Sequence, residues 1–488
     1  MDRRVRVRFA PSPTGPLHIG GARSAFFNWL FARKHQGDFV VRVEDTDVER
    51  STLVSEEVIL EDLKWLGMTW DEGISVGGEN GPYRQSERLS LYNTYWERLL
   101  EEEKAYRCYC TEEELEAERE SLRNKGEMPR YMGRCRDLTL QQRQKLESEG
   151  KKPTVRFQVP HGEVIPVEDL VRGRVEFESD GIGDFVIVKS DGIPTYNFAV
   201  VIDDALMEIS HVIRGEEHLS NTPRQIMIYK ALGFNMPEFA HISLILGEDR
   251  SKMSKRHGAT SIQQYREKGY LPHALLNFLA LLGWAPEGEK EIFSLSELVQ
   301  EFSLDRVSKS PAVFNLKKLD WMNSEYIKKE TPEVITRLAL PYLVEAGLME
   351  QDPSAQQYDW LVKVISLLQE QLHFVEEVVP FIQVFFGDRI DEFTPEALDM
   401  MKEESSPKVV ERFREQVLQE ENWEVPSIKT IFKGIGKELG VSGKKLFQPV
   451  RASLTGSLEG PDLQSLILLL GRERVGMRLA SALEKLKK

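Results

Sequence analysis

Cysteine is scarce in this sequence, with three residues in a chain of 488. An odd number cannot all pair, and the spacing of Cys108, Cys110 and Cys135 is not that of a disulfide framework, which argues against a disulfide-stapled secreted fold. Apolar runs are short as well, and none approaches the ~18 residues needed to cross a membrane. The charged start, Met1–Arg4, lacks the apolar stretch of a secretory signal. These absences predict a cytoplasmic protein without a membrane partner, and we expect a monomer.

The chain also lacks a surplus of positive charge. Its formal net charge is −15, which argues against a protein that coats nucleic acid unspecifically. Residues 425–488 depart from this trend, with twelve Lys and Arg against five Asp and Glu, an excess of +7. A local patch of this kind is compatible with a defined RNA partner. The length predicts several domains, because one core rarely serves more than about 250–300 residues.

The most informative stretch is Val5–Lys34. Apolar residues alternate with arginines up to Phe9, which predicts a strand, and apolar residues then recur at helical spacing. The Pro- and Gly-rich turn between them forbids a continuing strand. The helix start offers unpaired N–H groups that suit a phosphate, within reach of His18, while Gly20 and Gly21 let a flat ring lie against the backbone. An ordinary strand–turn–helix unit stays open as the alternative.

A second stretch, Arg250–Gly258, is a short basic loop with a small hydroxyl residue and a closing glycine. Its lysines, Lys252 and Lys255, are suited to stabilise the charge that grows as pyrophosphate leaves. The alternative is a solvated basic turn.

Together the two stretches resemble the paired signatures of class I aminoacyl-tRNA synthetases, with His18–Gly21 as the first and Lys252–Arg256 as the second. Much more of the chain is similar to one family, the bacterial-type glutamyl-tRNA synthetases, closely from residue 3 to about residue 323 and more loosely beyond. The other segments that carry this similarity are Arg8–Gly15, Arg42–Asp47, Thr195–Asp204, Val212–His218 and Leu271–Trp284.

The resemblance implies a two-step reaction. L-glutamate is activated with ATP, which carries Mg²⁺, to glutamyl-adenylate, and the glutamyl group then passes to the 3′ end of tRNA-Glu. The implied catalytic residues are His18, Lys252 and Lys255, and the implied ATP-binding residues are these three with Gly20, Gly21 and Ser254.

Glutamate carries two carboxylates, which suit forked guanidinium groups, and one ammonium, which needs an acid. By resemblance Arg8 and Arg214 take the first role and Glu44 the second. Ala10, Ser12 and Tyr196 complete the implied glutamate pocket.

The three cysteines form a Cys-x-Cys pair with a third cysteine 25 residues on, a spacing that suits Zn²⁺. Some bacterial relatives show this pattern in the insertion that splits their catalytic domain. The fourth ligand is left open between Tyr131 and Asp137. At the position of Asp137, relatives can carry a histidine. Three free thiols on a subdomain that has lost its metal are the alternative.

The expected fold class is an α/β Rossmann-type catalytic domain with an inserted α+β connective subdomain, followed by an all-α anticodon-binding region. We expect the catalytic halves at 1–105 and 191–247, the acceptor-binding insertion at 106–190, a stem-contact region at 248–325 and helices over 326–488, with a further split near 380 left open. Beyond residue 331 no alternating runs indicate a β-barrel, which counts against the bacterial glutaminyl-tRNA synthetases.

Specific elements are also predicted. We expect a helix over Val48–Leu66 with Val54, Val58, Leu63 and Leu66 in the core, a helix over Arg84–Lys104, and a strand over Ile242–Leu246. The predicted tail helices are 334–346, 359–374, 395–404, 407–419, 427–439, 462–470 and 471–486.

The tail also bears on the choice of tRNA. Some relatives that separate the glutamate from the glutamine anticodon use an arginine in the helical region, whereas residues 364–388 contain neither Arg nor Lys. Ser366, Gln369 and Gln371 are the polar residues expected near the reading face, so a relaxed enzyme that also uses tRNA-Gln is predicted. The functional alternatives are a tRNA-independent glutamate-activating paralogue, another adenylyltransferase, and a catalytically idle RNA-binding relative.

Overall fold

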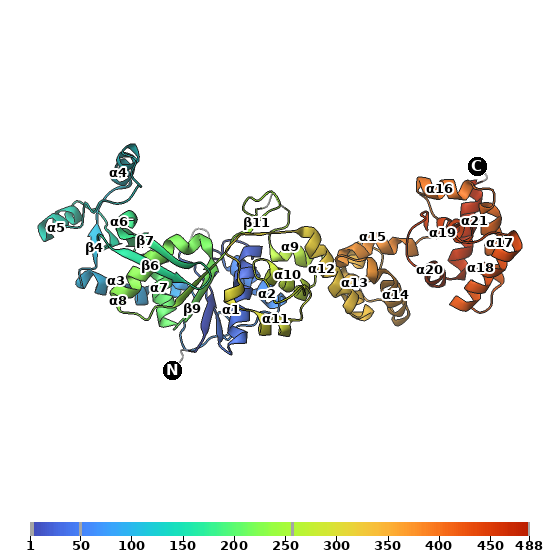
Figure 1. Ribbon diagram of the computed structural model, residues 1–488, viewed down its shortest axis with the longest axis horizontal. Coiled ribbons are helices and arrows are strands. Elements are labelled where there is room, and N and C mark those ends of the chain that lie inside the picture. Colours follow the sequence, from blue (N-terminus) through green and yellow to red (C-terminus); the bar gives the residue numbers. More distant parts are fainter. Residues whose placement is uncertain (1–3, 48–50, 255–257, 487–488) are drawn as a thin grey trace. The chain divides into compact units, whose positions relative to one another are not determined.

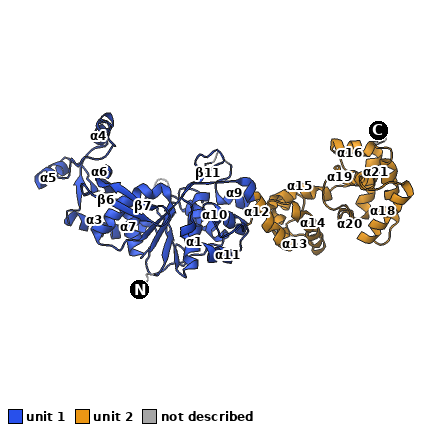
Figure 2. Ribbon diagram, viewed as in Figure 1, with its two compact units in different colours: residues 1–267, 272–319 blue, residues 268–271, 320–488 orange. Residues whose placement is uncertain are grey.

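The computed structural model describes residues 4–47, 51–254 and 258–486, and Lys255 and Arg256 lie outside this range. The chain divides into two compact units, coloured separately in Figure 2. The first contains residues 1–267 and 272–319, and the second contains residues 268–271 and 320–488.

The centre of the first unit holds two sheets, one that contains β1 (Arg6–Phe9) and one that contains β9 (His211–Gly215), which is labelled in Figure 1. On one side β1 pairs in parallel with β2 (Asp38–Val41), which pairs with β3 (Glu72–Gly73). On the other side of β1 the second sheet begins with β9, and the Ser210 N–H just before β9 donates to the Arg6 carbonyl oxygen at 2.9 Å. β9 pairs in parallel with β10 (Glu238–Ile242). Strands therefore run outward in both directions from β1, as in a doubly wound sheet.

Helix α1 (Ile19–Lys34) follows β1 and packs on this sheet because its apolar residues are buried almost all round. Phe26, Phe27 and Leu30 are fully buried. The other helices of the first unit that lie outside the insertion are α2 (Leu53–Trp65), α3 (Leu89–Glu101), α7 (Tyr196–Leu206), α8 (Thr222–Leu232), α9 (Ile262–Glu267), α10 (Pro272–Leu281) and α11 (Leu295–Glu301).

The segment between α3 and α7 forms its own structure. Strands β4 (Ala105–Cys108), β5 (Thr154–Phe157) and β8 (Phe185–Val188) make a small antiparallel sheet, accompanied by α4 (Glu112–Asn124), α5 (Leu140–Ser148) and the short α6 (Ser179–Ile182). A hairpin of β6 (Val164–Asp169) and β7 (Gly173–Glu178) joins the main sheet, where Asp169 of β6 pairs with Phe239 of β10. A segment inserted in the sequence thus reaches the central sheet at one residue pair.

Three predicted elements of the first unit differ from the structure. Helix α2 begins only at Leu53, and Val54 is 71% exposed rather than in the core, because the buried face runs through Ile59, Leu60 and Leu63. The predicted helix 84–104 opens with a 3₁₀ turn before α3 begins. The predicted strand 242–246 is divided between the end of β10 and a short strand, β11 (Ile245–Leu246), which pairs with β12 (Ala312–Val313).

Beyond β12 the described residues form helices and loops. Helix α12 (Leu316–Lys329) spans the boundary between the units, and α13 (Pro332–Glu345), α14 (Ala355–Leu368), α15 (Val378–Ile382), α16 (Pro395–Lys402), α17 (Ser406–Gln419), α18 (Val425–Leu439), α19 (Lys444–Thr455), α20 (Leu463–Leu470) and α21 (Arg472–Leu486) follow. Among the described helices, none is long and apolar enough to cross a membrane.

Four of these helices correct the sequence prediction, and among them α12 and α15 were not predicted. Helix α14 ends at Leu368 rather than near 374. Helix α19 was not predicted and contains Pro449, which a helix interior normally excludes. It is held by its apolar face, since Leu446, Val450 and Leu454 recur at every fourth position and are buried.

Candidate active site

The loop between β1 and α1 ends in a capped helix start. His18 is the N-cap of α1, and its Nδ1 accepts the Gly20 N–H at 3.1 Å. In the neutral ring the proton is therefore on Nε2, which is left to donate to a ligand. Burial, and secondarily the charge of Lys252, lowers the pKa of His18 below its ordinary value, which keeps the ring neutral at neutral pH.

The two signature stretches lie together. Backbone bonds join the segment that follows the basic loop to the α1 entry, from Ile19 N–H to Thr260 O and from Ile262 N–H to Leu17 O, both at 2.9 Å. The basic loop folds back on β11, since the Met253 N–H donates to Ile245 O at 3.1 Å. His18 and the exposed Lys252 line one cavity of ≈ 340 Å³.

Of the other residues predicted to bind ATP, some line this cavity and others do not. Gly20 and Gly21 form part of its wall, and Ser254 is half-buried in the loop beyond Met253. Lys255 lies outside the described residues, so its predicted role is not addressed by the structure.

A second cavity, of ≈ 480 Å³, adjoins the first, and Gly20, Gly21 and Glu217 are among the residues that line both. All six residues predicted for glutamate line it: Arg8, Ala10, Ser12, Glu44, Tyr196 and Arg214. A ligand in this cavity would lie beside a nucleotide in the neighbouring one, the arrangement that an adenylyl transfer needs.

Sequence reasoning missed several residues of the second cavity. Glu217 and His218 line it, with Thr46, Asp47 and Gln85. The signal for four of them was present, because Glu217 and His218 belong to the Val212–His218 segment that carries the family resemblance, and Thr46 and Asp47 belong to the Arg42–Asp47 segment. Burial, and secondarily the charge of Arg214, lowers the pKa of His218 to about 4, so that its ring is neutral and its Nδ1 lies 3.2 Å from the Tyr196 hydroxyl.

Arg8 enters the cavity from a buried ion-pair network. Its Nε donates to Asp204 at 3.1 Å, and Arg42 donates to the same carboxylate at 2.5 Å. Asp203 next to it accepts from Arg88 at 2.7 Å and from Tyr92 at 3.0 Å. The Arg8–Asp204 ion pair is buried rather than at the surface. Within the described part of the chain only Nε of Arg8 has a hydrogen-bond partner, so both Nη groups are left for a ligand.

The network contains equal numbers of positive and negative side chains. Its buried charges are three arginines, Arg8, Arg42 and Arg88, and three carboxylates, Glu44, Asp203 and Asp204. Burial alone would lower the pKa of Arg42, but Asp204, Asp203 and Glu44 hold it above its ordinary value. Burial raises the pKa of Glu44, and Arg42 and Arg8 only partly oppose this, so a cation from a ligand would favour its charged form.

Arg214 has a different environment. Every hydrogen-bond partner that it has among the described residues is a neutral side chain: His241 at 3.1 Å, Tyr196 at 3.3 Å, Thr222 at 2.9 Å and Gln225 at 2.8 Å. Only 6% of Arg214 is exposed. A buried cation whose contacts are neutral leaves its charge for an anionic group of a ligand in the same cavity.

The three cysteines converge in the small sheet subdomain. Their sulfur atoms lie within 4.8 Å of one another, and the Tyr131 hydroxyl is 3.5 Å from Cys108 Sγ and 3.6 Å from Cys110 Sγ. Asp137 is exposed and does not belong to this group. Of the two candidates for a fourth ligand, the structure brings Tyr131 to the sulfurs and leaves Asp137 outside.

One predicted anticodon-reading residue is placed differently. Gln369 is buried, and its amide donates to Ile327 O at 2.6 Å and to Glu330 O at 2.8 Å, which caps the end of α12. The prediction that Gln369 lies near a reading face is therefore wrong, because its donors satisfy helix carbonyls. Ser366 and Gln371 are exposed.

Fold and site together define a class I tRNA synthetase. The catalytic-domain model of the class I tRNA synthetases (E and Q) matches residues 4–321, and an anticodon binding domain model matches residues 334–483. Within that class, the chain belongs to the glutamate–tRNA ligase family. The predicted family and fold class are both confirmed.

Individual relatives support this assignment over nearly the full length of the chain. The chain is 58% identical to the glutamate–tRNA ligase of Carboxydothermus hydrogenoformans, over 97% of this chain and 99% of the relative, and 56% identical to that of Desulforamulus reducens, over 98% and 100%. A crystal structure of a glutamate tRNA ligase from Elizabethkingia meningosepticum, in complex with its amino acid, is 36% identical with a TM-score of 0.91, covering 99% of this chain and 100% of that one.

Proposed function

We propose that this enzyme joins L-glutamate to tRNA-Glu in two steps with ATP, and that it selects glutamate through Arg214. The observation that carries the choice of amino acid is the buried Arg214 guanidinium, whose hydrogen-bond partners are neutral side chains. The side-chain carboxylate of glutamate would compensate its charge, whereas the neutral amide of glutamine would leave the charge buried and uncompensated. Arg8 then holds the other carboxylate, and Glu44 meets the ammonium.

In the first step a carboxylate oxygen of glutamate attacks the α-phosphorus of ATP, and the bond to pyrophosphate breaks. The protein contributes position and charge rather than covalent chemistry. The Nε2–H of His18 donates to the phosphates at the start of α1, and Lys252 with Lys255 stabilises the leaving pyrophosphate, while Mg²⁺ arrives with the ATP. In the second step a terminal ribose hydroxyl of the tRNA attacks the acyl carbon and releases AMP.

The test is an aminoacylation assay with ATP, Mg²⁺, tRNA-Glu and either labelled glutamate or labelled glutamine. We expect acid-precipitable label from glutamate alone. Equal incorporation of glutamine would refute the role of Arg214. ATP binding without any incorporation of glutamate would refute the activity and favour an idle RNA-binding relative.

We also propose a Zn²⁺ site made by Cys108, Cys110, Cys135 and Tyr131. Tetrahedral zinc with bonds of about 2.3 Å to sulfur sets its ligand atoms about 3.8 Å apart. The observed separations fit, since Cys110 Sγ lies 3.6 Å from both Cys135 Sγ and the Tyr131 hydroxyl. This choice replaces Asp137 with Tyr131 as the fourth ligand. When bound, the metal would tie β4 to the loop that carries Cys135.

Purified without chelator, the protein should contain about one zinc per chain. Elemental analysis measures the metal, and Asp137→Ala is the matched control, which should retain it. Tyr131→Phe should bind zinc more weakly, because it keeps the ring and removes the oxygen ligand. Metal-free protein that is fully folded and active would contradict the site.

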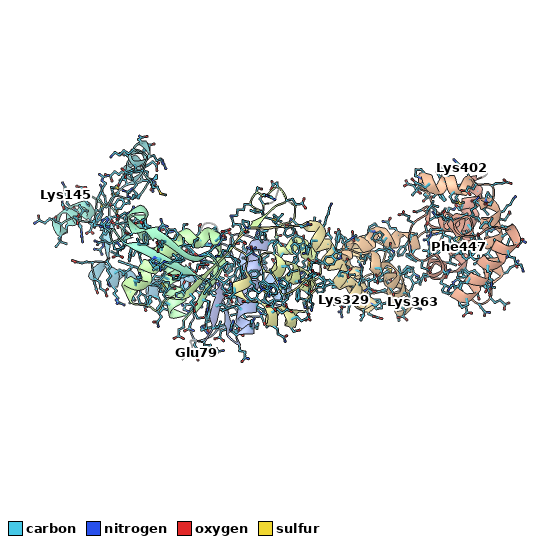
Figure 3. All side chains as sticks on the ribbon, in the orientation of Figure 1. Glu79, Lys145, Lys329, Lys363, Lys402 and Phe447 are labelled. Atoms are coloured by element: carbon cyan, nitrogen blue, oxygen red, sulfur yellow. The ribbon has the colours of Figure 1, made fainter. Side chains whose placement is uncertain are left out.

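The tail is proposed to read the anticodon. Lys429, Lys433 and Lys437 recur every fourth position along α18 and are exposed, so they form one basic stripe. Phe447 of α19, labelled in Figure 3, is 38% exposed in the same group of helices. Cationic side chains near an exposed ring suit unstacked bases of a tRNA loop. We retain the division at 1–105, 106–190, 191–247, 248–325 and 326–488, and a monomer, as parts of this proposal.

We further propose that tRNA-Gln is also glutamylated. Residues 364–388 contain no Arg or Lys, and Gln369 is committed to capping α12, which leaves neutral, exposed Ser366 and Gln371. Neutral side chains separate C from G weakly at the third anticodon base, because each base offers both donors and acceptors. Measured kcat/KM values for the two purified tRNAs should differ by less than about a thousandfold, and a larger preference, worth about 4 kcal/mol, would overturn the proposal.

A further inference from the structure

Behind Arg214 lies a buried carboxylate–imidazole pair that the proposed reaction does not use. His241 of β10 and Asp169 of β6 both have fully buried side chains, and His241 Nδ1 lies 2.6 Å from Asp169 Oδ2. On its other side, His241 Nε2 lies 3.1 Å from Arg214 Nε and 3.1 Å from the Thr222 hydroxyl. One imidazole thus connects a carboxylate to the arginine that lines the glutamate cavity.

The position of Asp169 is fixed by backbone. It is the last residue of β6, at the one point where the β6–β7 hairpin pairs with β10. Its carboxylate accepts the N–H groups of Val171 at 2.9 Å, Arg172 at 2.7 Å and His241 at 3.1 Å. Although burial alone would raise it, these bonds with the His241 side chain hold the pKa of Asp169 below its ordinary value, so Asp169 is ionised.

An ionised Asp169 determines which nitrogen of His241 carries the proton. A carboxylate only accepts, so Nδ1 holds the hydrogen and Nε2 presents a bare lone pair to the Arg214 Nε–H. Burial lowers the pKa of His241, which keeps the ring neutral and Nε2 an acceptor. If Nε2 carried the proton, its N–H would face the N–H of Arg214 Nε. Two donors repel each other, so the guanidinium would be displaced.

This pair therefore orients Arg214. Nε of Arg214 is fixed by His241, and one Nη is fixed by Thr222 at 2.9 Å and Gln225 at 2.8 Å. Toward the residues that the structure describes, the other Nη makes a single long bond, to the Tyr196 hydroxyl at 3.3 Å, and both Arg214 and Tyr196 line the glutamate cavity. The hydrogen bonds behind the guanidinium leave that nitrogen for the ligand.

We propose that Asp169 and His241 are positioning residues for amino-acid selection, which hold the Arg214 fork toward the glutamate carboxylate by fixing the His241 tautomer. The proposal rests on the proposed role of Arg214. It also means that the β6–β7 hairpin, which belongs to the segment inserted between α3 and α7, supplies a carboxylate that supports the amino-acid site.

The primary test is Asp169→Asn in the full-length enzyme, assayed by glutamate-dependent ATP–pyrophosphate exchange. The amide N–H₂ would donate to Nδ1 and move the proton to Nε2, against Arg214. We expect the glutamate KM to rise about 10- to 100-fold, by analogy with partners that orient metal ligands, with the ATP KM unchanged. Asp184→Asn is the matched control: it removes another buried carboxylate of the insertion, one that holds Tyr106 and Arg136, and it should leave the glutamate KM in place.

A second pair of variants keeps the test decisive if Asp169→Asn folds poorly. His241→Gln can still accept from Arg214 and donate to Asp169, whereas His241→Leu can do neither. We expect His241→Gln to keep a glutamate KM near that of the wild type. We expect His241→Leu to raise the glutamate KM. Equal KM values for the two, or an unchanged glutamate KM in folded Asp169→Asn, would overturn the positioning role.

Two further measurements separate this inference from the proposed function. A nitrogen-15 spectrum of histidine-labelled enzyme should show His241 protonated on Nδ1 and bare on Nε2, and the reverse tautomer would contradict the inference. If Arg214→Gln leaves the use of glutamate intact, the proposed function fails. If Arg214→Gln impairs it but His241→Leu does not, only the positioning inference fails.

Discussion

Replacing Arg214 with glutamine should reduce kcat/KM for glutamate by about 3 to 5 kcal/mol, because removing one partner of a buried charge pair leaves the other uncompensated. That free energy corresponds to a loss of about 150-fold to 5,000-fold. Glutamine keeps much of the side-chain length and polarity, and its amide can still accept from Tyr196 or donate to Gln225. The loss should therefore fall on the ligand carboxylate rather than on the fold.

The measurement is glutamate-dependent ATP–pyrophosphate exchange with varied glutamate and varied ATP. The glutamate KM should rise steeply while the ATP KM stays nearly constant, since Arg214 lines the second cavity and is absent from the lining of the first. Arg33→Gln is a matched control, because Arg33 pairs with Asp71 at 2.7 Å on the surface. If ATP use suffers as much as glutamate use, Arg214 is structural and the proposed selection fails.

Arg8 makes a useful comparison with Arg214. Its charge is already met by Asp204 within the balanced network, so Arg8→Gln would leave Arg42 as the one arginine bonded to Asp204 among the residues that the structure describes. We infer that this variant would lose stability together with glutamate binding. The two arginines were predicted to have the same role, but they have different charge partners. A substitution of Arg214 therefore tests glutamate recognition without the loss of stability expected for Arg8.

Read without the family resemblance, the sequence predicted only those parts of the site whose residues are neighbours in the chain, whereas the distant residues of the glutamate cavity were predicted through the resemblance. His18 and Gly20 belong to one turn, and the cap bond between them is a local interaction. The alternation of β1 also predicted a strand, but it could not show that Arg8 is buried against a distant carboxylate, Asp204. Local periodicity carries no information about such a partner.

The support behind the site could not be predicted for the same reason. Asp169 and His241 are 72 positions apart, and Arg88 reaches Asp203 across 115 positions. Their meeting depends on how β6 joins β10 and on how α3 packs, which are tertiary facts. Likewise Gln369 was expected to face the anticodon, whereas its amide satisfies the end of α12, 39 to 42 positions earlier in the chain.

The second large effect is expected at Lys252. Its ammonium lines the same cavity as His18, and its charge, after burial, is the second cause that lowers the pKa of His18. As the bond to pyrophosphate breaks, negative charge grows on the leaving group. A cation at this position stabilises the transition state more than bound ATP.

Lys252→Ala should therefore lower kcat for ATP–pyrophosphate exchange by about a hundredfold to a thousandfold, about 3 to 4 kcal/mol, by analogy with lost oxyanion donors. Equilibrium binding of ATP, measured by titration, should change little, and Lys230→Ala, an exposed lysine at the end of α8, is the control. Lys255→Ala tests the same role for the lysine assigned from sequence. Because a uniform binding contact would weaken ATP binding and rate together, equal losses in the two would contradict a clamp that acts on the transition state.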